Sequence, residues 1–215
     1  MTGKASASTT RSRLAIAVSG SGRSLANFIA NSKSDSNYEI AAVIASNSDC
    51  RGVAIAREHD IPVFIGDFVK EISSTTLTLS AWLSDLKIDW IVLAGFLKRF
   101  PVLEPWQHRL VNIHPALLPD FGGKGMYGDR VHAAVLAAGK TVSGATVHFV
   151  NERYDEGSII AQVVVPVLAD DDTHTLADRV FAAECKLYPA VVRRLVSGTL
   201  PLPNGGIERY DHEQL

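Results

Sequence analysis

The feature that most constrains the fold is a regular alternation between short apolar runs and segments of helical periodicity. Apolar runs stand at residues 14–18, 40–45, 62–65 and 90–94, and the segments between them repeat apolar residues at helical spacing. Runs that are apolar throughout are typical of strands covered on both faces. Strands that alternate with helices in this way predict an α/β fold with a parallel sheet and right-handed crossovers.

The remaining elements follow from the same patterns. We expect helices over 24–31, within 67–87, over 129–138 and over 176–196, and one more that runs from candidate caps at 47–49 through Arg57. We expect further strands over 110–113, 144–150 and 159–167. Pro189 should interrupt the last helix, because proline lacks the N–H group that continues a helix. No repeat or linker divides the chain, so we expect one domain over 13–202, between a disordered N-terminal tail at 1–12 and a C-terminal tail at 203–215.

Composition excludes several classes of function. The 215 residues carry a formal net charge of −2, so there is no global basic field to hold nucleic acid. The two cysteines, Cys50 and Cys185, form no CxxC pair, which argues against a disulfide framework or a cysteine metal site and favours a reducing cytoplasm. No apolar run reaches the length of a membrane span, and the first residues lack the apolar core of a signal peptide.

A glycine-containing loop, Ser19-Gly20-Ser21-Gly22-Arg23-Ser24-Leu25, lies between the first expected strand and the first expected helix. Glycines let the backbone approach a ligand, and the start of the helix presents free N–H groups to an anion. A dinucleotide fingerprint would have a third glycine near Leu25 and an acidic residue after the second strand, where the chain has 45–47, Ala-Ser-Asn. The loop therefore favours a monophosphate over a nicotinamide dinucleotide, with a plain strand-to-helix turn as the alternative.

A second candidate site is Asn112-Ile113-His114-Pro115 at the end of an expected strand. Asn112 and His114 are two residues apart, so their side chains share one face of the strand. The carboxyl ends of parallel strands are where open sheets bind ligands. An amide donor beside an imidazole suits a reaction that develops an oxyanion and moves a proton. A lone histidine is more often structural, and the Asn-x-His-Pro context is what favours the functional interpretation.

A third candidate is the polar loop 151–157, Asn-Glu-Arg-Tyr-Asp-Glu-Gly. Solvated acids are the ordinary interpretation of such a loop. The loop gains a functional meaning if Asp155 reaches His114, where it would orient the imidazole and favour its protonated form.

Together, in this order and spacing, these segments resemble the phosphoribosylglycinamide formyltransferase family. The resemblance extends from Leu14 to about Leu202 and includes Ser19-Gly20-x-Gly22, Ser46-Asn47, Val92-Leu93-Ala94-Gly95-Phe96, Asn112-Ile113-His114-Pro115, Leu117-Leu118-Pro119, Thr146-Val147-His148-Phe149-Val150 and Asp155-x-Gly157. It implies a single-domain, Rossmann-like formyltransferase fold with a mostly parallel twisted sheet flanked by helices. It also implies transfer of the formyl group of 10-formyltetrahydrofolate to the amine of 5'-phosphoribosylglycinamide in purine biosynthesis.

The resemblance also implies roles for individual residues. Asn112, His114 and Asp155 match the catalytic trio, with Asn112 and His114 stabilising a tetrahedral intermediate and Asp155 holding His114 protonated. Residues matching the ribonucleotide site are Gly22, Arg23 and Ser24 at the phosphate and Glu184 at the ribose hydroxyls. Residues matching the folate pocket are Leu97, Lys98, Arg99, Phe100, Asn112, Asn151, Glu152 and Tyr154. The segment 122–127 falls in a mobile substrate loop.

This chain departs from the family in three places. Lys98 stands where many members have arginine, Cys185 follows Glu184 where histidine is frequent, and residues 73–79 offer no counterpart of a folate-side arginine. We expect small-molecule substrates only, no metal, no nucleic acid, no membrane, and a monomer or homodimer.

The sequence alone leaves other functions open. Methionyl-tRNA formyltransferases and formyltetrahydrofolate deformylases share the Asn-x-His and the distant Asp, but normally carry an extra domain for which we expect no room here. A formyl transfer to another amine and a non-catalytic nucleotide- or folate-binding module are further alternatives. The incomplete glycine fingerprint disfavours a nicotinamide dehydrogenase.

Overall fold

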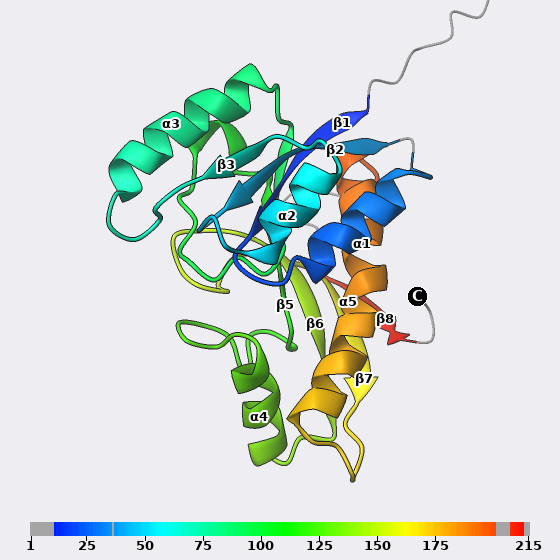
Figure 1. Ribbon diagram of the computed structural model, residues 1–215. Coiled ribbons are helices and arrows are strands. Elements are labelled where there is room, and N and C mark those ends of the chain that lie inside the picture. Colours follow the sequence, from blue (N-terminus) through cyan, green and yellow to red (C-terminus); the bar gives the residue numbers. More distant parts are fainter. Residues whose placement is uncertain (1–10, 36, 201–206, 213–215) are drawn as a thin grey trace, which may run out of the picture.

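The computed structural model describes residues 11–35, 37–200 and 207–212. In this part of the chain, eight strands form one sheet in the order β3-β2-β1-β4-β5-β6-β7-β8 (Figure 1). The strands are β1 (Ser12–Val18), β2 (Tyr38–Ala45), β3 (Val63–Ile65), β4 (Trp90–Leu93), β5 (Leu110–His114), β6 (Val142–Phe149), β7 (Ile159–Pro166) and β8 (Glu208–Asp211). Pairing is parallel from β3 to β5 and from β7 to β8, and antiparallel on both sides of β6. The predicted α/β class with a mostly parallel sheet is confirmed.

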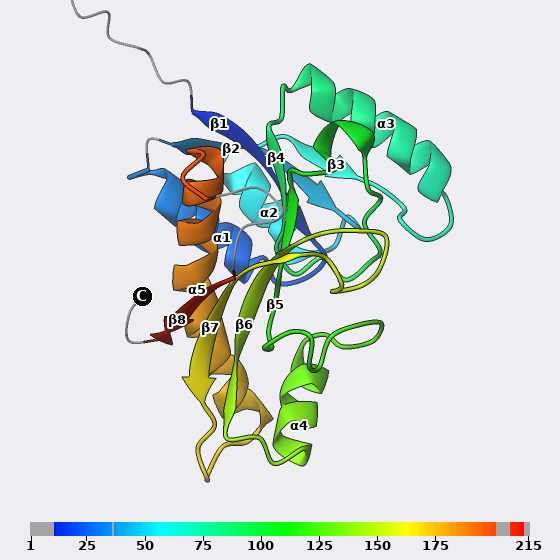
Figure 2. The ribbon, with the colours of Figure 1, turned by 180° about the vertical axis from the view of Figure 1, so that it is seen from behind.

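Helices cover both faces of the sheet, because its strands are apolar on both faces. The helices are α1 (Arg23–Ser32), α2 (Arg51–Glu58), α3 (Ile72–Asp85), η1 (Glu104–Trp106), α4 (Asp129–Ala137) and α5 (Thr173–Val196). One core cluster joins α1, α2 and α5 to one face, and a second joins α3 and the segment 100–106 to the other. Accordingly, α1 and α2 lie in front of the sheet in Figure 1 and behind it in Figure 2.

The long helix α5 corrects one prediction, since it runs through Pro189 without interruption. Proline leaves the carbonyl four residues earlier without its helical N–H partner. Here that carbonyl belongs to Cys185, and the side-chain amide of Asn27 in α1 donates a hydrogen bond to it at 2.8 Å. The helix therefore continues because a neighbouring helix supplies the missing donor.

A buried tyrosine on α5 ties this helix to the strands that end at the functional pocket. The Tyr188 hydroxyl lies 3.1 Å from the carbonyl oxygen of Leu93 in β4 and 3.0 Å from that of Val111 in β5. Because its side chain is 2% exposed, these contacts provide the partners that a buried hydroxyl needs. The last residue of β4 and the beginning of β5 are thereby held in a fixed position relative to α5.

The ends of the chain differ in part from expectation. Ser12, within the expected tail at 1–12, is the first residue of β1, whereas residues 1–10 lie outside the described part. Within the expected tail at 203–215, Glu208–Asp211 forms the edge strand β8, which we did not predict. Its sequence Glu-Arg-Tyr-Asp has no apolar run, and β8 is fixed instead by its pairing with β7 and by an ion pair between Glu208 and Arg194 of α5. Residues 203–206 and 213–215 lie outside the described part.

One helix lies within its predicted range, and another lacks its predicted caps. Helix α3 (Ile72–Asp85) lies within 67–87 and follows a turn in which Asp67 accepts hydrogen bonds from the N–H groups of Val69 and Lys70. Helix α2 begins after Cys50, and no side chain caps it, so the candidate caps at 47–49 do not act as caps.

Candidate active site

A pocket of about 620 Å³ opens where β1, β4 and β5 end. The chain runs from β1 to β2 on one side, while β4 and β5 lie on the other, so the pocket lies at a reversal of strand order, where open sheets bind ligands. Its wall includes every predicted site residue: Gly22, Arg23, Ser24, Leu97, Lys98, Arg99, Phe100, Asn112, His114, Asn151, Glu152, Tyr154, Asp155 and Glu184. The structure brings these residues together, while their individual roles stay predictions.

The centre of the pocket is formed by the pairing of β5 with β6. Asn112 is the cross-strand partner of His148, and His114 is that of Thr146. The Asn112 amide nitrogen lies 3.2 Å from His148 Nε2. His148 Nδ1 lies 2.8 Å from the carbonyl oxygen of Phe149, which can only accept, so Nδ1 carries a proton. His148 Nε2 consequently faces both the Asn112 amide and the Asp155 carboxylate.

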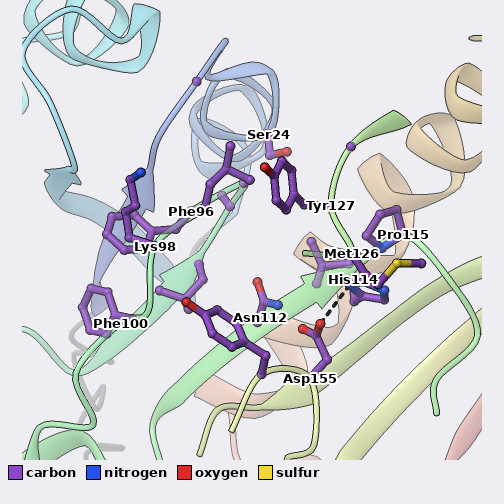
Figure 3. A pocket seen from close by; sticks show the side chains of 18 of the residues that line it. Ser24, Phe96, Lys98, Phe100, Asn112, His114, Pro115, Met126, Tyr127 and Asp155 are labelled. Atoms are coloured by element: carbon purple, nitrogen blue, oxygen red, sulfur yellow. Dashed lines mark ion pairs between the residues drawn. The ribbon is translucent and has the colours of Figure 1, made fainter. Parts of the chain in front are cut away.

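Asp155 lies between the two histidines, and Figure 3 shows it facing His114. One carboxylate oxygen is 3.5 Å from His114 Nδ1 and the other is 3.6 Å from His148 Nε2. The N–H group of Gly123 donates a hydrogen bond to this carboxylate at 2.9 Å. The predicted proximity of Asp155 to His114 is thus confirmed. The Gly123 contact also joins this carboxylate to the loop that follows β5.

The second ring nitrogen of His114 faces a carbonyl oxygen. His114 Nε2 lies 2.8 Å from the backbone oxygen of Phe121, so this nitrogen carries a proton and donates. The neutral imidazole consequently directs the lone pair of Nδ1 toward Asp155. A proton added at Nδ1 would complete an ion pair with that carboxylate.

Burial and Asp155 act in opposite directions on the charge of His114. The His114 side chain is 4% exposed, and this burial lowers the pKa of the imidazole, although Asp155 and the Phe121 carbonyl both raise it. For Asp155, burial raises the pKa, but contacts with His148, His114 and the Gly123 N–H outweigh it, so the pKa is lowered. Asp155 thus favours the protonated imidazole while burial favours the neutral one, and the expectation that Asp155 holds His114 protonated stays a prediction.

The predicted phosphate loop begins α1. Gly22 has φ 70°, a left-handed conformation that favours glycine, and no side chain caps the first turn of the helix. The first N–H groups of α1 are thus without a side-chain cap at the pocket wall, where an anion would bind. The Arg23 guanidinium lies 4.0 Å above the ring of Phe181 and 3.8 Å from the carboxylate of Asp178.

Glu184, on α5, lines the same pocket as this loop. Its burial raises the pKa of the carboxyl to about 8, and the positive charge of Arg23 lowers it only in part. The raised pKa favours the protonated carboxyl group, which can donate as well as accept a hydrogen bond. That chemistry fits the hydroxyl groups of a sugar better than it fits a cation.

The opposite part of the wall is aromatic. Phe96 packs edge-on against Phe100 with ring centroids 5.4 Å apart, and both rings contact Phe68. An ion pair between Arg99 and Glu152 joins the segment after β4 to the loop after β6. These two segments are the predicted walls of the folate pocket, and the ion pair holds them together.

The pocket wall also contains residues that were not predicted as site residues, among them His132, His148 and Phe181. His132 lies on α4 with a 4% exposed side chain, and its Nδ1 atom has no hydrogen-bond partner among the described residues. Burial lowers the pKa of His132. His148 belongs to a segment that we singled out, but its role depends on which residue of β5 it pairs with, and the register between strands is not readable from one sequence.

Comparison with known proteins connects this geometry to a family. A family model described as formyl transferase matches residues 12–192. The chain is 39% identical to the chloroplastic phosphoribosylglycinamide formyltransferase of Arabidopsis thaliana over 210 residues, covering 95% of this chain and 72% of that protein. The chain belongs to the phosphoribosylglycinamide formyltransferase family.

Two further relatives define how far the likeness to this family extends. The chloroplastic phosphoribosylglycinamide formyltransferase of Vigna unguiculata is 42% identical over 190 residues, which are 86% of this chain and 61% of that protein. The crystal structure of phosphoribosylglycinamide formyltransferase from Anaplasma phagocytophilum superimposes with a TM-score of 0.79 at 34% identity, covering 92% of this chain and 93% of that one. The phosphoribosylglycinamide formyltransferase fold that we expected is therefore confirmed.

Among the described residues, no group of three or more His, Cys, Asp or Glu side chains is arranged to hold a metal ion, and the expected metal independence stays a prediction. No helix in the described ranges is long and apolar enough to cross a membrane.

Proposed function

We propose that this chain transfers the formyl group of 10-formyltetrahydrofolate to the amine of 5'-phosphoribosylglycinamide, a step of purine biosynthesis. The observation that carries the proposal is that Asn112, His114 and Asp155 meet at the centre of one pocket, between a candidate anion site and an aromatic wall. Membership of the phosphoribosylglycinamide formyltransferase family supports the same reaction.

The ribonucleotide would bind between α1 and α5. Its phosphate would accept hydrogen bonds from the uncapped N–H groups at Gly22, Arg23 and Ser24, with the Arg23 guanidinium as the nearby cation. Its ribose hydroxyls would contact Glu184, whose carboxyl group, when protonated, can both donate and accept. This orientation directs the glycyl amine toward His114.

The folate would bind on the other side of the trio. Its ring system would lie between the segment Leu97 to Phe100 and the loop that carries Asn151, Glu152 and Tyr154. The Tyr154 side chain is 40% exposed and Leu97 is 47% exposed, so both offer apolar surface to a ligand. The edges of the ring would find hydrogen-bond partners in the exposed backbone of these two segments.

Chemistry would begin with attack of the amine on the formyl carbon. A new bond between the amine nitrogen and this carbon forms while the carbonyl electrons move to oxygen, giving a tetrahedral intermediate. Asn112 would donate its second amide proton to that oxygen, because its first is engaged by His148. Neutral His114 would accept the proton of the attacking amine at Nδ1 and form an ion pair with Asp155.

The intermediate would then collapse toward products. The bond between the formyl carbon and the folate nitrogen breaks, and the proton held by His114 moves to that nitrogen. The products are formylated ribonucleotide and tetrahydrofolate, so no proton is gained or lost overall. His114 returns to the neutral form that burial favours.

An absorbance assay of folate release tests the proposal. We expect the protein to release tetrahydrofolate from 10-formyltetrahydrofolate only when the ribonucleotide is present. Release without ribonucleotide would identify a hydrolase of the formyl group. No release under either condition would contradict formyl transfer to this acceptor.

The surroundings of the reaction are also proposals. We infer that Asn112 polarises the carbonyl and His114 moves the proton without a metal, so activity should survive exhaustive chelation with EDTA and dialysis. We infer small-molecule partners only, and a monomer or homodimer. Two relatives are chloroplastic by name, so the predicted cytoplasmic location stays a prediction.

A further inference from the structure

A buried polar network lies behind the catalytic trio, on the strands β6 and β7. The Thr146 hydroxyl donates to the carbonyl oxygen of Ala116 at 2.6 Å and accepts from the N–H group of Leu118 at 3.0 Å. The Gln162 side-chain amide donates to the same hydroxyl at 3.1 Å and to the carbonyl oxygen of Leu118 at 2.9 Å. Thr146 is 0% exposed and Gln162 is 4% exposed, so none of these bonds competes with bulk water.

This network fixes the backbone of one short segment. All of its backbone contacts fall on Ala116 and Leu118, in the irregular segment that follows β5. Irregular backbone that is buried needs hydrogen-bond partners outside itself, because it has no helix or sheet ladder. Thr146 and Gln162 supply those partners from two neighbouring strands, which pair directly with each other at these two residues.

The same segment connects to His114 at both of its ends. His114 immediately precedes it on β5 and is the cross-strand partner of Thr146. The carbonyl oxygen of Phe121, three residues beyond Leu118, lies 2.8 Å from His114 Nε2. That contact places the ring proton on Nε2 and leaves the Nδ1 lone pair facing Asp155.

We infer that Thr146 and Gln162 are positioning residues for His114, holding the segment from Ala116 to Phe121 so that its last carbonyl fixes the imidazole. Neither residue needs to touch a substrate, and neither lines the pocket among the described residues. The inference rests on the proposed role of His114 in formyl transfer. It predicts a defect in the chemical step rather than in substrate binding.

Variants that remove the network without changing side-chain volume test this inference. Thr146→Val deletes the hydroxyl, and Gln162→Met deletes both amide donors. Thr146→Ser restores the hydroxyl. Ser143→Ala is a matched control, because Ser143 is a buried residue of the same strand whose hydroxyl has no partner among the described residues.

The first readout is the His114 titration in the unliganded protein, followed by NMR and assigned with a His114→Asn variant. Thr146→Val and Gln162→Met should lower the His114 pKa, because the Phe121 carbonyl that raises it is no longer held in place. The proton on Nε2 should also become less favoured. Thr146→Ser and Ser143→Ala should titrate as wild type. This readout needs no turnover, so it stands apart from whether the protein transfers a formyl group.

The second readout is steady-state kinetics of formyl transfer. Thr146→Val and Gln162→Met should lower kcat roughly 10- to 100-fold with little change in KM for either substrate, the effect of a misplaced catalytic group. An unchanged His114 titration in both variants would overturn the inference. The inference would also be overturned if the loss of activity followed only the melting temperature and Thr146→Ser did not restore the activity. If one variant fails to fold, the other carries the test.

Discussion

Asp155 contacts both histidines of the site, and a backbone carbonyl holds a proton on the far nitrogen of each ring. Phe149 accepts from His148 Nδ1, and Phe121 accepts from His114 Nε2. Asn112, His114 and Asp155 were each predicted from short motifs. The role of His148 was not, because it depends on a cross-strand register. The effect of burial on His114, which lowers its pKa, was not predicted either, because burial cannot be read from the residues beside it in sequence.

At the residue scale, truncating either the proposed oxyanion donor Asn112 or the proposed proton carrier His114 should abolish most of the activity. Asn112→Ala and His114→Ala should each lower turnover by on the order of 100- to 1000-fold, the usual loss when one such donor is removed. Single-turnover kinetics at saturating substrates measure this directly, and circular dichroism checks that the fold survives. Near-normal turnover of His114→Ala would remove this residue from the reaction.

The pH dependence of the reaction tests the Asp155 contact. Because burial lowers the His114 pKa below its usual 6.5, activity should fall as the pH drops through that lowered value and Nδ1 becomes protonated. Asp155→Asn removes a negative charge that raises this pKa, so the acidic limb should move to lower pH while the maximal rate decreases. The limb is measured as kcat/KM against pH, and the histidine titration by NMR. If neither the acidic limb nor the histidine titration shifts in Asp155→Asn, Asp155 has no electrostatic role at His114.

At the scale of elements, patterns of apolar residues located the strands from β1 to β7, mostly to within two residues, because each buries an apolar run. Two elements needed information that the local sequence lacks. Helix α5 passes Pro189 because Asn27, distant in sequence, binds the freed carbonyl of Cys185. Strand β8 is short and polar, and it depends on β7 and on Arg194 for its place.

The turn that carries Asp155 gives an element-scale prediction. A Cβ at Gly157 would overlap the carbonyl oxygen of Phe149 at the end of β6. Gly157→Ala should therefore shift the backbone between β6 and β7 and lower the free energy of unfolding by about 1–3 kcal/mol, the usual cost of overpacking. Urea denaturation measures this change. Gly20→Ala is the control for stability, because a Cβ there meets nothing within 4 Å, and equal losses in the two variants would contradict the account.

At the scale of the whole molecule, the alternation of strands and helices predicted the parallel part of the sheet and the position of the pocket at the ends of β1, β4 and β5. The antiparallel direction of β6 was not predicted, because an apolar run carries no direction. That reversal has functional importance. It brings His148 opposite Asn112 and Thr146 opposite His114, so the sheet itself forms the base of the site.

The most direct test of the central claim follows the formyl group itself. Purified protein is incubated with 5'-phosphoribosylglycinamide and folate that carries an isotope-labelled formyl group, and the ribonucleotide is analysed by mass spectrometry. We predict one labelled formyl group on the ribonucleotide with wild-type protein and almost none with Asn112→Ala or His114→Ala. An unformylated ribonucleotide with folded wild-type protein, or equal formylation by the variants, would contradict the assignment of formyl transfer to this site.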